Sequence, residues 1–115
     1  MLFNSLTGKT LIQNTKKASS AWARFKGLMF EKKKKFDYGL IFELDSETKI
    51  GASIHMMFVF FPIDIIYLNS KKVVIDKKTV KPWILNYTPK QAAKYFIETP
   101  VGATKVKIWD KLDWK

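Results

Sequence analysis

Short apolar runs separated by polar turn residues dominate the chain. Runs of this kind, rich in Ile, Val, Phe and Tyr and bounded by Gly, Pro, Asn or Ser, are typical of β-strands. The expected strands are, in chain order, residues 10–15, 39–44, 52–57, 63–68, 72–80 and 95–99, with a last short pair between residues 106 and 114 around Asp110.

Helical patterning is confined to two short segments. Ser19 or Ser20 is a suitable N-cap for a helix that runs through Phe25, and Gly27 is a natural residue just beyond its end. A helical turn is also expected at residues 89–93. Many short strands at regular spacing predict a mainly β, single-domain protein over residues 1–115, a small sandwich or barrel with one short N-terminal helix.

Composition narrows the class of protein. The 115 residues are 47% hydrophobic and 15% aromatic, which is enough for one core, and none is a cysteine, which excludes thiol catalysis and Cys-ligated metals. A membrane-spanning helix needs about 20 apolar residues, but the longest run, residues 56–63, contains Pro62. The first residues also lack a basic start that leads into a long apolar stretch. We expect a soluble, cytoplasmic protein without a cofactor.

The charge is strongly positive and comes almost entirely from lysine. The formal net charge is +11, Arg24 is the sole arginine, and residues 1–35 carry nine basic residues against one acidic residue. Lysines support loose contact with polyanions better than sequence reading, for which arginine is preferred. Candidates for such contact with nucleic acid are Lys16, Lys17, Lys26, Lys32, Lys33, Lys34 and Lys35, with Trp22 and Phe25 as the aromatic candidates for base stacking.

The preferred explanation of this charge is compositional. Lysine enrichment is common in proteins of thermophiles, and a lysine-rich surface of an archaeal or thermophilic protein needs no partner. Lys32, Lys33, Lys34 and Lys35 follow one another, so they are expected to form an exposed connection.

The sole histidine, His55, and an isolated Asp64 lie in the otherwise apolar segment of residues 54–68. Polar groups that are buried without partners are costly, so each requires a partner. If residues 52–57 and 63–68 form a hairpin, His55 lies opposite Asp64 with the two Cβ atoms roughly 5 Å apart. A shift of one residue would place them on opposite faces. The pair is interpreted first as a structural contact and second as part of a binding site at the mouth of a barrel.

Catalysis and metal binding receive little support. Ser53 would share a face with His55, but nothing resembles a nucleophile elbow, so a hydrolase with His55 or Asp64 as general base ranks last. Met29, together with the methionines at 56 and 57, offers soft ligands for Cu(I), although methionine in an apolar run is more often core. No metal site is predicted, because no second histidine or cysteine exists.

Several blocks together resemble a known family, domain of unknown function 192, in its archaeal form. Gly27-Leu28-Met29-Phe30 is similar to the signature of that family, and Arg24 matches a common upstream arginine. The later blocks are residues 39–42, 54–58, 61–68, 81–83 and 95–102. One departure is Thr99-Pro100-Val101-Gly102, where Leu-Pro-Ala-Gly is more usual. The resemblance runs from about residue 10 to the C-terminus and implies a compact, mainly β fold; it supplies no activity and no catalytic residues.

The motif residues define one candidate site. Glu98 lies among apolar residues, so a lysine or Arg24 is expected to neutralise it. We predict a module that binds a small ligand or a partner beside the 27–30 loop, and the candidate residues are Arg24, Met29, His55, Asp64 and Glu98. Non-specific binding of nucleic acid or another polyanion through the lysine-rich N-terminal third remains the alternative.

Overall fold

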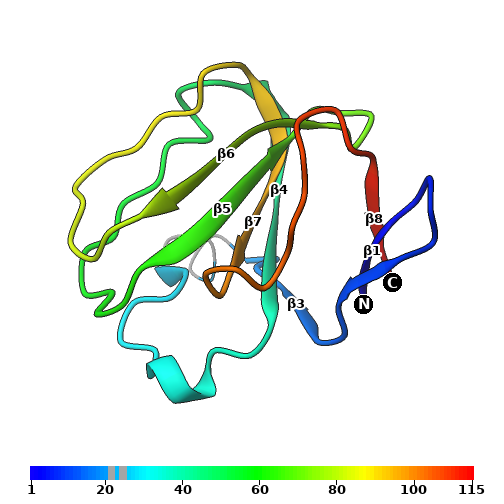
Figure 1. Cartoon of the computed structure of the whole chain (residues 1–115). Helices are drawn as coiled ribbons and strands as arrows, with labels where there is room; N and C mark the ends of the chain where they lie inside the picture. Colours follow the sequence, from blue (N-terminus) through cyan, green and yellow to red (C-terminus); the bar gives the residue numbers. More distant parts are fainter. Residues whose placement is uncertain (21–22, 24–25) are drawn as a thin grey trace.

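The computed structural model describes residues 1–20, 23 and 26–115, and its regular structure is almost entirely β (Figure 1). The strands are β1 (Leu2–Asn4), β2 (Thr10–Ile12), β3 (Thr15–Lys17), β4 (Gly39–Thr48), β5 (Ile63–Leu68), β6 (Val74–Val80), β7 (Ala93–Thr99) and β8 (Leu112–Trp114). A 3₁₀ turn, η1 (Lys33–Lys35), lies between β3 and β4.

The strands form two sheets. The large sheet has the order β3-β4-β7-β5-β6, in which only β3 and β4 run parallel, and the small sheet has the order β2-β1-β8. In the small sheet the first and last strands of the chain are neighbours, as the adjacent N and C labels in Figure 1 show. The Met1 amino group donates a hydrogen bond to the Lys115 carbonyl at 2.9 Å, so the two ends of the chain close the fold together.

One face of the large sheet packs against the small sheet through aliphatic side chains. Alternate residues of a strand point to opposite faces, and this face receives Ile41, Ile66 and Ile97 from three neighbouring strands. Leu2 and Leu112, both 0% exposed, meet them from the small sheet. The two sheets therefore form two packed layers, and the side chains that meet at these five positions are all aliphatic.

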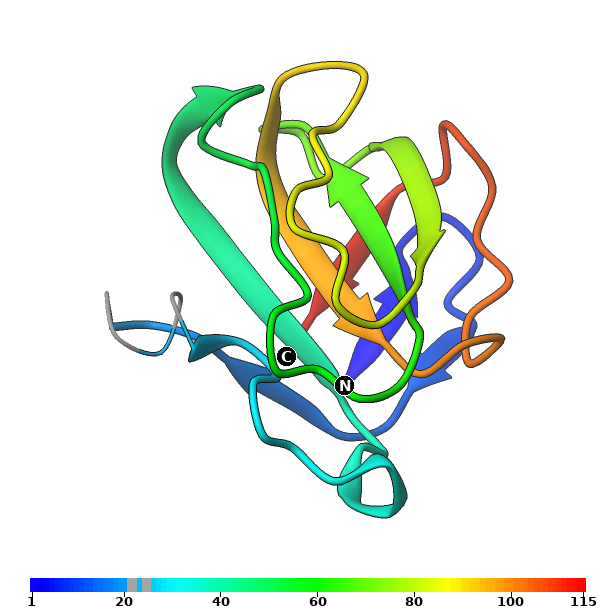
Figure 2. The same cartoon turned by 90° about the vertical axis from the view of Figure 1, so that its left-hand side faces the viewer.

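Loops, rather than strands, cover the other face of the large sheet. Figure 2 shows the segments 50–62 and 81–92 passing in front of the strands. These loops are joined by an isolated bridge between Ile54 and Tyr87. The core beneath them is rich in aromatic rings, among them Phe42 and Phe96, which stack with their centroids 4.3 Å apart. We call this side the loop-covered face.

The sequence located the strands of the large sheet well. Residues 63–68 form β5 as expected, and the expected strands at 39–44, 72–80 and 95–99 correspond to β4, β6 and β7 with shifted ends. The largest shift is in β4, which continues beyond its apolar residues to Thr48. An irregularity in register between Glu43 and Thr48 allows this polar extension to pair again with β7. A mainly β fold with two packed sheets is therefore confirmed.

Four expected elements were wrong. Residues 52–57 form no strand, only the bridge at Ile54, and residues 10–15 split into β2 and β3, which belong to different sheets. The helical turn at residues 89–93 is absent, since the chain bends at 90–91 and enters β7 at Ala93. The C-terminal strand does not pair within residues 106–114, because β8 completes the small sheet beside β1. Each error concerns which segment pairs with which, and alternation within one segment does not specify its partner.

The expected N-terminal helix is not shown. Four of its residues, 21, 22, 24 and 25, lie outside the described part of the chain. Around them, the Ser20 hydroxyl accepts a bond from the Ala23 amide at 2.9 Å, and the Gly27 amide donates to the Ala23 carbonyl at 3.0 Å. Gly27 has a φ of 48°, a left-handed conformation that glycine adopts without strain.

Candidate functional site

Glu98 lies in the middle of the loop-covered face. It belongs to β7, the central strand of the large sheet, and is flanked by Leu40 on β4 and Ile65 on β5. Its side chain is 5% exposed, and its Oε1 atom has no hydrogen-bond partner among the described residues. Because burial penalises the charged form, the pKa of Glu98 is raised to about 8. The carboxyl group is therefore mainly protonated at neutral pH and available as a hydrogen-bond donor.

A cavity of about 210 Å³ opens beside this carboxyl group. Its walls include the stacked rings of Phe42 and Phe96, the Gly27 turn, and the loop that carries His55. A Cβ atom at Gly27 would lie 3.5 Å from Glu98 Oε1 and 3.7 Å from Phe42 Cζ. The missing side chain at Gly27 thus leaves room directly above the carboxyl group.

Two polar side chains of the loop at residues 52–57 line the same cavity. His55 is half-buried, and its Nδ1 atom accepts a bond from the Met57 amide at 3.2 Å, which places the proton of a neutral imidazole on Nε2. The Ser53 hydroxyl is 2.8 Å from the Thr88 hydroxyl on the second covering loop. The lining of the cavity therefore includes aromatic rings, one buried carboxyl group, an imidazole, a hydroxyl and the exposed Lys26.

The predicted pairing of His55 with Asp64 is wrong. Asp64 lies opposite Thr79 and Thr99 in the sheet, not opposite His55. It alternates with Ile63 and Ile65, so it belongs to the face that is remote from Glu98. Its carboxylate accepts bonds from the Thr79 hydroxyl and, at 2.9 Å, from the Gly102 amide. The hairpin does not form because residues 52–57 are not a strand, and the Ser53–His55–Asp64 triad is not assembled.

Of the two remaining site candidates, only Met29 belongs to the described residues. Met29 is half-buried in the turn after Lys26, to whose carbonyl its amide donates at 2.9 Å. It is absent from the residues that line the cavity. Arg24, and with it the expected Arg24–Glu98 pair, lies outside the described residues.

The candidate lysines occupy several regions rather than one. Lys16 and Lys17 belong to β3, and the Lys16 Nζ atom lies 4.1 Å from the centroid of the Tyr38 ring. Lys26 lines the cavity beside Glu98. The residues 32–35 surround η1 and are all exposed, as expected. Only this last group is a dense cluster.

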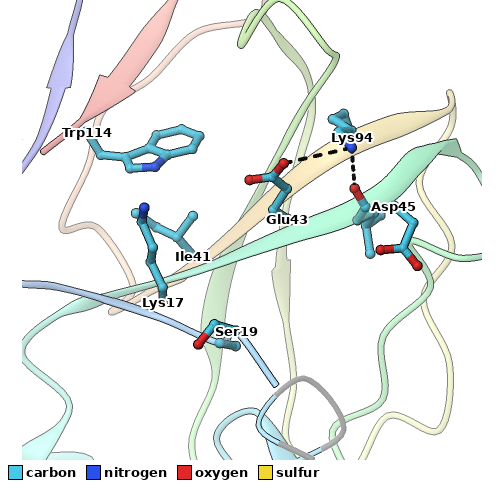
Figure 3. Close-up of a pocket in the computed structure, with 9 residues that line it drawn as sticks. Lys17, Ser19, Ile41, Glu43, Asp45, Lys94 and Trp114 are labelled. Carbon is cyan, nitrogen blue, oxygen red and sulfur yellow. Dashed lines mark hydrogen bonds and ion pairs between the residues drawn. The ribbon is translucent and has the colours of Figure 1, made fainter. Parts of the chain in front are cut away.

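A larger hollow of about 410 Å³ lies next to β3 and the end of β8 (Figure 3). Lys94 bridges its wall, since its Nζ atom is 3.9 Å from the Glu43 carboxylate and donates to the Leu44 carbonyl. Lys17 and Trp114 face each other at its other end. Because the Lys94 charge is already compensated within the wall, we interpret this hollow as a surface ion-pair region.

Sequence analysis missed two buried polar groups on the loop-covered face. Asp76 is 5% exposed and accepts bonds from the Tyr87 hydroxyl, the Lys90 amide and the Lys77 amide, so it anchors the covering loop to β6. Its position directly after the apolar run 73–75 was the available signal. The Tyr67 hydroxyl is buried and has no hydrogen-bond partner in the described part of the chain, and burial raises its pKa.

No helix in the described ranges is long and apolar enough to cross a membrane. No cluster of three or more His, Cys, Asp or Glu residues suited to a metal ion occurs in those ranges either.

Comparisons with known proteins agree with the resemblance seen in the motifs. The model of the DUF192 family, described as "Uncharacterized ACR", matches residues 4–114. A UPF0127 protein of Thermococcus sibiricus is 43% identical over 100% of this chain and 75% of its own length. Another, from Pyrococcus furiosus, is 42% identical over 98% of this chain and 97% of its own length.

Solved structures share the fold at low sequence identity. A crystal structure of a protein of unknown function from Novosphingobium aromaticivorans has a TM-score of 0.77 at 22% identity, over 87% of this chain and 74% of that one. A structure from Sinorhizobium meliloti has a TM-score of 0.75 at 19% identity, over 86% and 79%. Likeness at this identity supports the fold alone.

Proposed function

Because this chain belongs to the DUF192 family, whose description assigns no activity, we propose a function from the geometry of its own cavity: a single-domain module that binds a small ligand beside Glu98. The observation that carries the proposal is the carboxyl group of Glu98, 5% exposed and with Oε1 unpaired among the described residues, at the wall of an open cavity. A buried polar group without a partner is costly, and a ligand would supply the missing bond.

The chemistry of the cavity favours a neutral ligand with a hydrogen-bonding head group. With a pKa raised to about 8, the Glu98 carboxyl is protonated at neutral pH, so it donates one hydrogen bond and accepts another. An amide or a similar group pairs with both. The Phe42 and Phe96 rings suit a short apolar body, and about 210 Å³ limits the ligand to few heavy atoms.

Binding is favoured over catalysis at this site. The Ser53 hydroxyl is directed to Thr88 and not to His55. The Asp64 carboxylate, which a triad would need, bonds on the other face of the sheet. Ser53, His55 and Asp64 therefore do not form the chain of hydrogen bonds that links nucleophile, base and acid in a catalytic triad.

Acetamide is a suitable probe, and NMR of the labelled protein is a suitable measurement. At neutral pH we expect saturable shifts of the Gly27, Ser53 and His55 amide signals. Methylammonium should shift them less, because it needs the carboxyl group in its charged form. The acetamide shifts should disappear as the pH rises above about 8, since the Glu98 carboxyl then loses the proton it donates.

The variant Gly27→Ala places a methyl group 3.5 Å from Glu98 Oε1 and should abolish these shifts. Its control is Gly8→Ala, which introduces an alanine at a comparably left-handed φ of 79° where no heavy atom lies within 4 Å. Shifts that survive in Gly27→Ala, or a wild-type protein that responds to neither probe, would contradict the proposal.

A further inference from the structure

Four aromatic side chains form an exposed cluster at one end of the loop-covered face. Phe30, Phe60 and Trp83 are 62%, 59% and 46% exposed, and Phe58 is half-buried among them. The Phe30 and Phe58 rings stack with their centroids 4.8 Å apart, while Trp83 meets Phe58 and Phe60 edge-on at 5.0 and 5.6 Å. These residues come from three different loops, and we call them the aromatic platform.

Three residues of the aromatic platform have a strained backbone conformation. Phe30, Phe58 and Trp83 have φ values of 62°, 58° and 64°, a left-handed conformation that costs a non-glycine residue about 1–2 kcal/mol. Backbone bonds join the loops, from the Phe30 amide to the Phe58 carbonyl at 2.8 Å and from the Trp83 amide to the Met56 carbonyl at 3.0 Å. The left-handed conformation of these residues lowers the stability of the fold while it leaves large apolar rings exposed. Backbone strain of this kind is concentrated at functional sites.

Positive charge borders the platform on one side. Phe30 and Phe60 line a shallow hollow of about 810 Å³ together with Lys32, Lys33 and Lys34. The 3₁₀ turn η1 carries Lys33, Lys34 and the next lysine, and all of them are exposed. The acidic residue of this hollow, Glu31, already accepts a bond from the Tyr38 hydroxyl at 2.7 Å. The hollow therefore joins uncovered aromatic rings to several lysines.

We propose that this surface binds single-stranded nucleic acid, with bases stacked on the aromatic platform and phosphates beside Lys32–Lys35. Stacking on aromatic side chains requires unpaired bases, tolerates any sequence, and is worth about 1–3 kcal/mol per base. Lysines supply the phosphate contacts without reading base edges. An acidic peptide or an anionic membrane would also match the charge, and exposed Phe and Trp side chains can enter a membrane interface, so both occupants are outcomes of the test below. Three solvent-facing rings beside lysines suit successive unpaired bases and their phosphates, which favours single-stranded nucleic acid.

The platform differs from the arrangement expected from sequence. Trp22 and Phe25, the aromatic candidates named from sequence, both lie outside the described part of the chain. In the structure Phe30 and Phe60 lie beside the lysines, and Phe58 and Trp83 extend the platform from loops further along the chain. The proposal does not depend on the cavity beside Glu98, which is lined by other residues of the same loops.

The first test is fluorescence anisotropy with labelled oligo(dT) and oligo(U) of about ten nucleotides, within the usual length of such sites. We expect both to bind at low salt, and a duplex of equal length to bind more weakly because its bases are already stacked. Each phosphate contact should contribute about −0.7 to the slope of log affinity against log salt. The variant with Lys32→Gln, Lys33→Gln and Lys34→Gln should therefore flatten the slope by about 2.

The aromatic rings are tested separately from the charge. Phe60→Ala and Trp83→Ala should each weaken binding about tenfold and leave the salt slope unchanged, since a stacked base and not a phosphate contact is lost. Phe60→Leu, which keeps an apolar side chain, should behave like Phe60→Ala. Circular dichroism and thermal melting of every variant establish that it is folded.

Matched controls exist at the far end of β6. Trp109 is 69% exposed and has a φ of 78°. Its amide donates a hydrogen bond to the carbonyl of Val74, the first residue of β6, whereas Trp83 lies just after Val80, the last residue of β6. Trp109→Ala and the combined change Lys105→Gln, Lys107→Gln and Lys111→Gln should leave affinity nearly unaltered.

Several results would overturn the proposal. One is the absence of binding at low salt. Another is an equal loss from both lysine triplets with no effect of the rings, which would indicate general charge attraction. Polyglutamate or phosphatidylglycerol vesicles that bind as tightly as oligo(dT), through the same rings, would assign the surface to an acidic protein or to a membrane.

Discussion

The two faces of the large sheet differ in chemistry as well as in what covers them. Against the small sheet, aliphatic side chains such as Ile66 and Ile97 are fully buried. Under the loops, aromatic rings are mixed with polar groups, and the buried side-chain atoms without hydrogen-bond partners in the described residues, Tyr67 Oη and Glu98 Oε1, both lie there. The buried hydrophobic cluster between the two sheets is aliphatic, whereas the loop-covered face holds two buried polar atoms that lack hydrogen bonds within the described residues.

The backbone differs between loops and strands. Phe30, Phe58 and Trp83 adopt left-handed φ values in the loops beyond the loop-covered face, and Lys72 and Trp109 do so in turns near the small sheet. The strands of both sheets contain none of the non-glycine residues with positive φ in the described ranges. Loops that must both cover a sheet and present rings to solvent accept conformations that a regular strand avoids. The comparison therefore assigns stability mainly to one face and candidate binding surfaces to the other.

The largest expected effect concerns Glu98 and pH. In the unfolded chain this carboxyl loses its proton near pH 4.5, whereas in the folded protein it keeps the proton until about pH 8. Between these values the folded state binds more protons, so its contribution to stability falls as the pH rises, by on the order of 4–5 kcal/mol in total. Chemical denaturation at several pH values should show this fall in the wild type, and Glu98→Gln should remove it from the profile.

The adjacent Ile97 provides a control on the opposite face. Ile97→Val should reduce stability by about 1 kcal/mol at every pH in this window, because it removes one buried methylene group and no titrating group. If Glu98→Gln leaves the pH profile of the wild type unchanged, the buried carboxyl group is not protonated at neutral pH and the contrast between the faces weakens.

Two tyrosine hydroxyls under the loops should respond in opposite ways. Tyr87→Phe removes the 3.1 Å bond to the buried Asp76 and should cost about 1–2 kcal/mol. Tyr67→Phe removes a hydroxyl that is buried without a partner in the described structure, so stability should be equal or higher by up to about 1 kcal/mol. Urea denaturation of the two variants gives the comparison, and a large loss in Tyr67→Phe would show that its hydroxyl is satisfied.

The smallest expected effect separates backbone strain from ring packing. At the φ of 62° of Phe30, glycine is unstrained and alanine is not, so Phe30→Gly should be about 1 kcal/mol more stable than Phe30→Ala. Ile50, 84% exposed and without a positive φ, is the control, and there glycine should be no more stable than alanine. Thermal melting of the four variants decides the matter, and equal values for the Phe30 pair would remove the strain argument.

The strands that were located correctly from sequence were recognised by short apolar runs between turn residues. Residues 63–68 were predicted as a strand from their apolar run, and they form β5, in which Ile63, Ile65 and Tyr67 face the loops while Ile66 faces the small sheet. His55 was placed wrongly because residues 52–57 were also predicted as a strand, whereas they form a loop. Glu98 was recognised as a candidate from its apolar neighbours, but its cavity depends on Gly27 and on loops that only the folded chain brings together.

The sequence by itself determined the family, the mainly β class, the strands of the large sheet and the exposed lysine cluster. These follow from local composition and from side chains that alternate every two residues along a strand. Only the tertiary structure decided that β8 joins β1, that Asp64 and Glu98 lie on opposite faces, and that Phe30, Phe58 and Trp83 meet. Those outcomes depend on contacts between distant segments and on left-handed backbone angles, for which no short-range pattern of residues provides a signal.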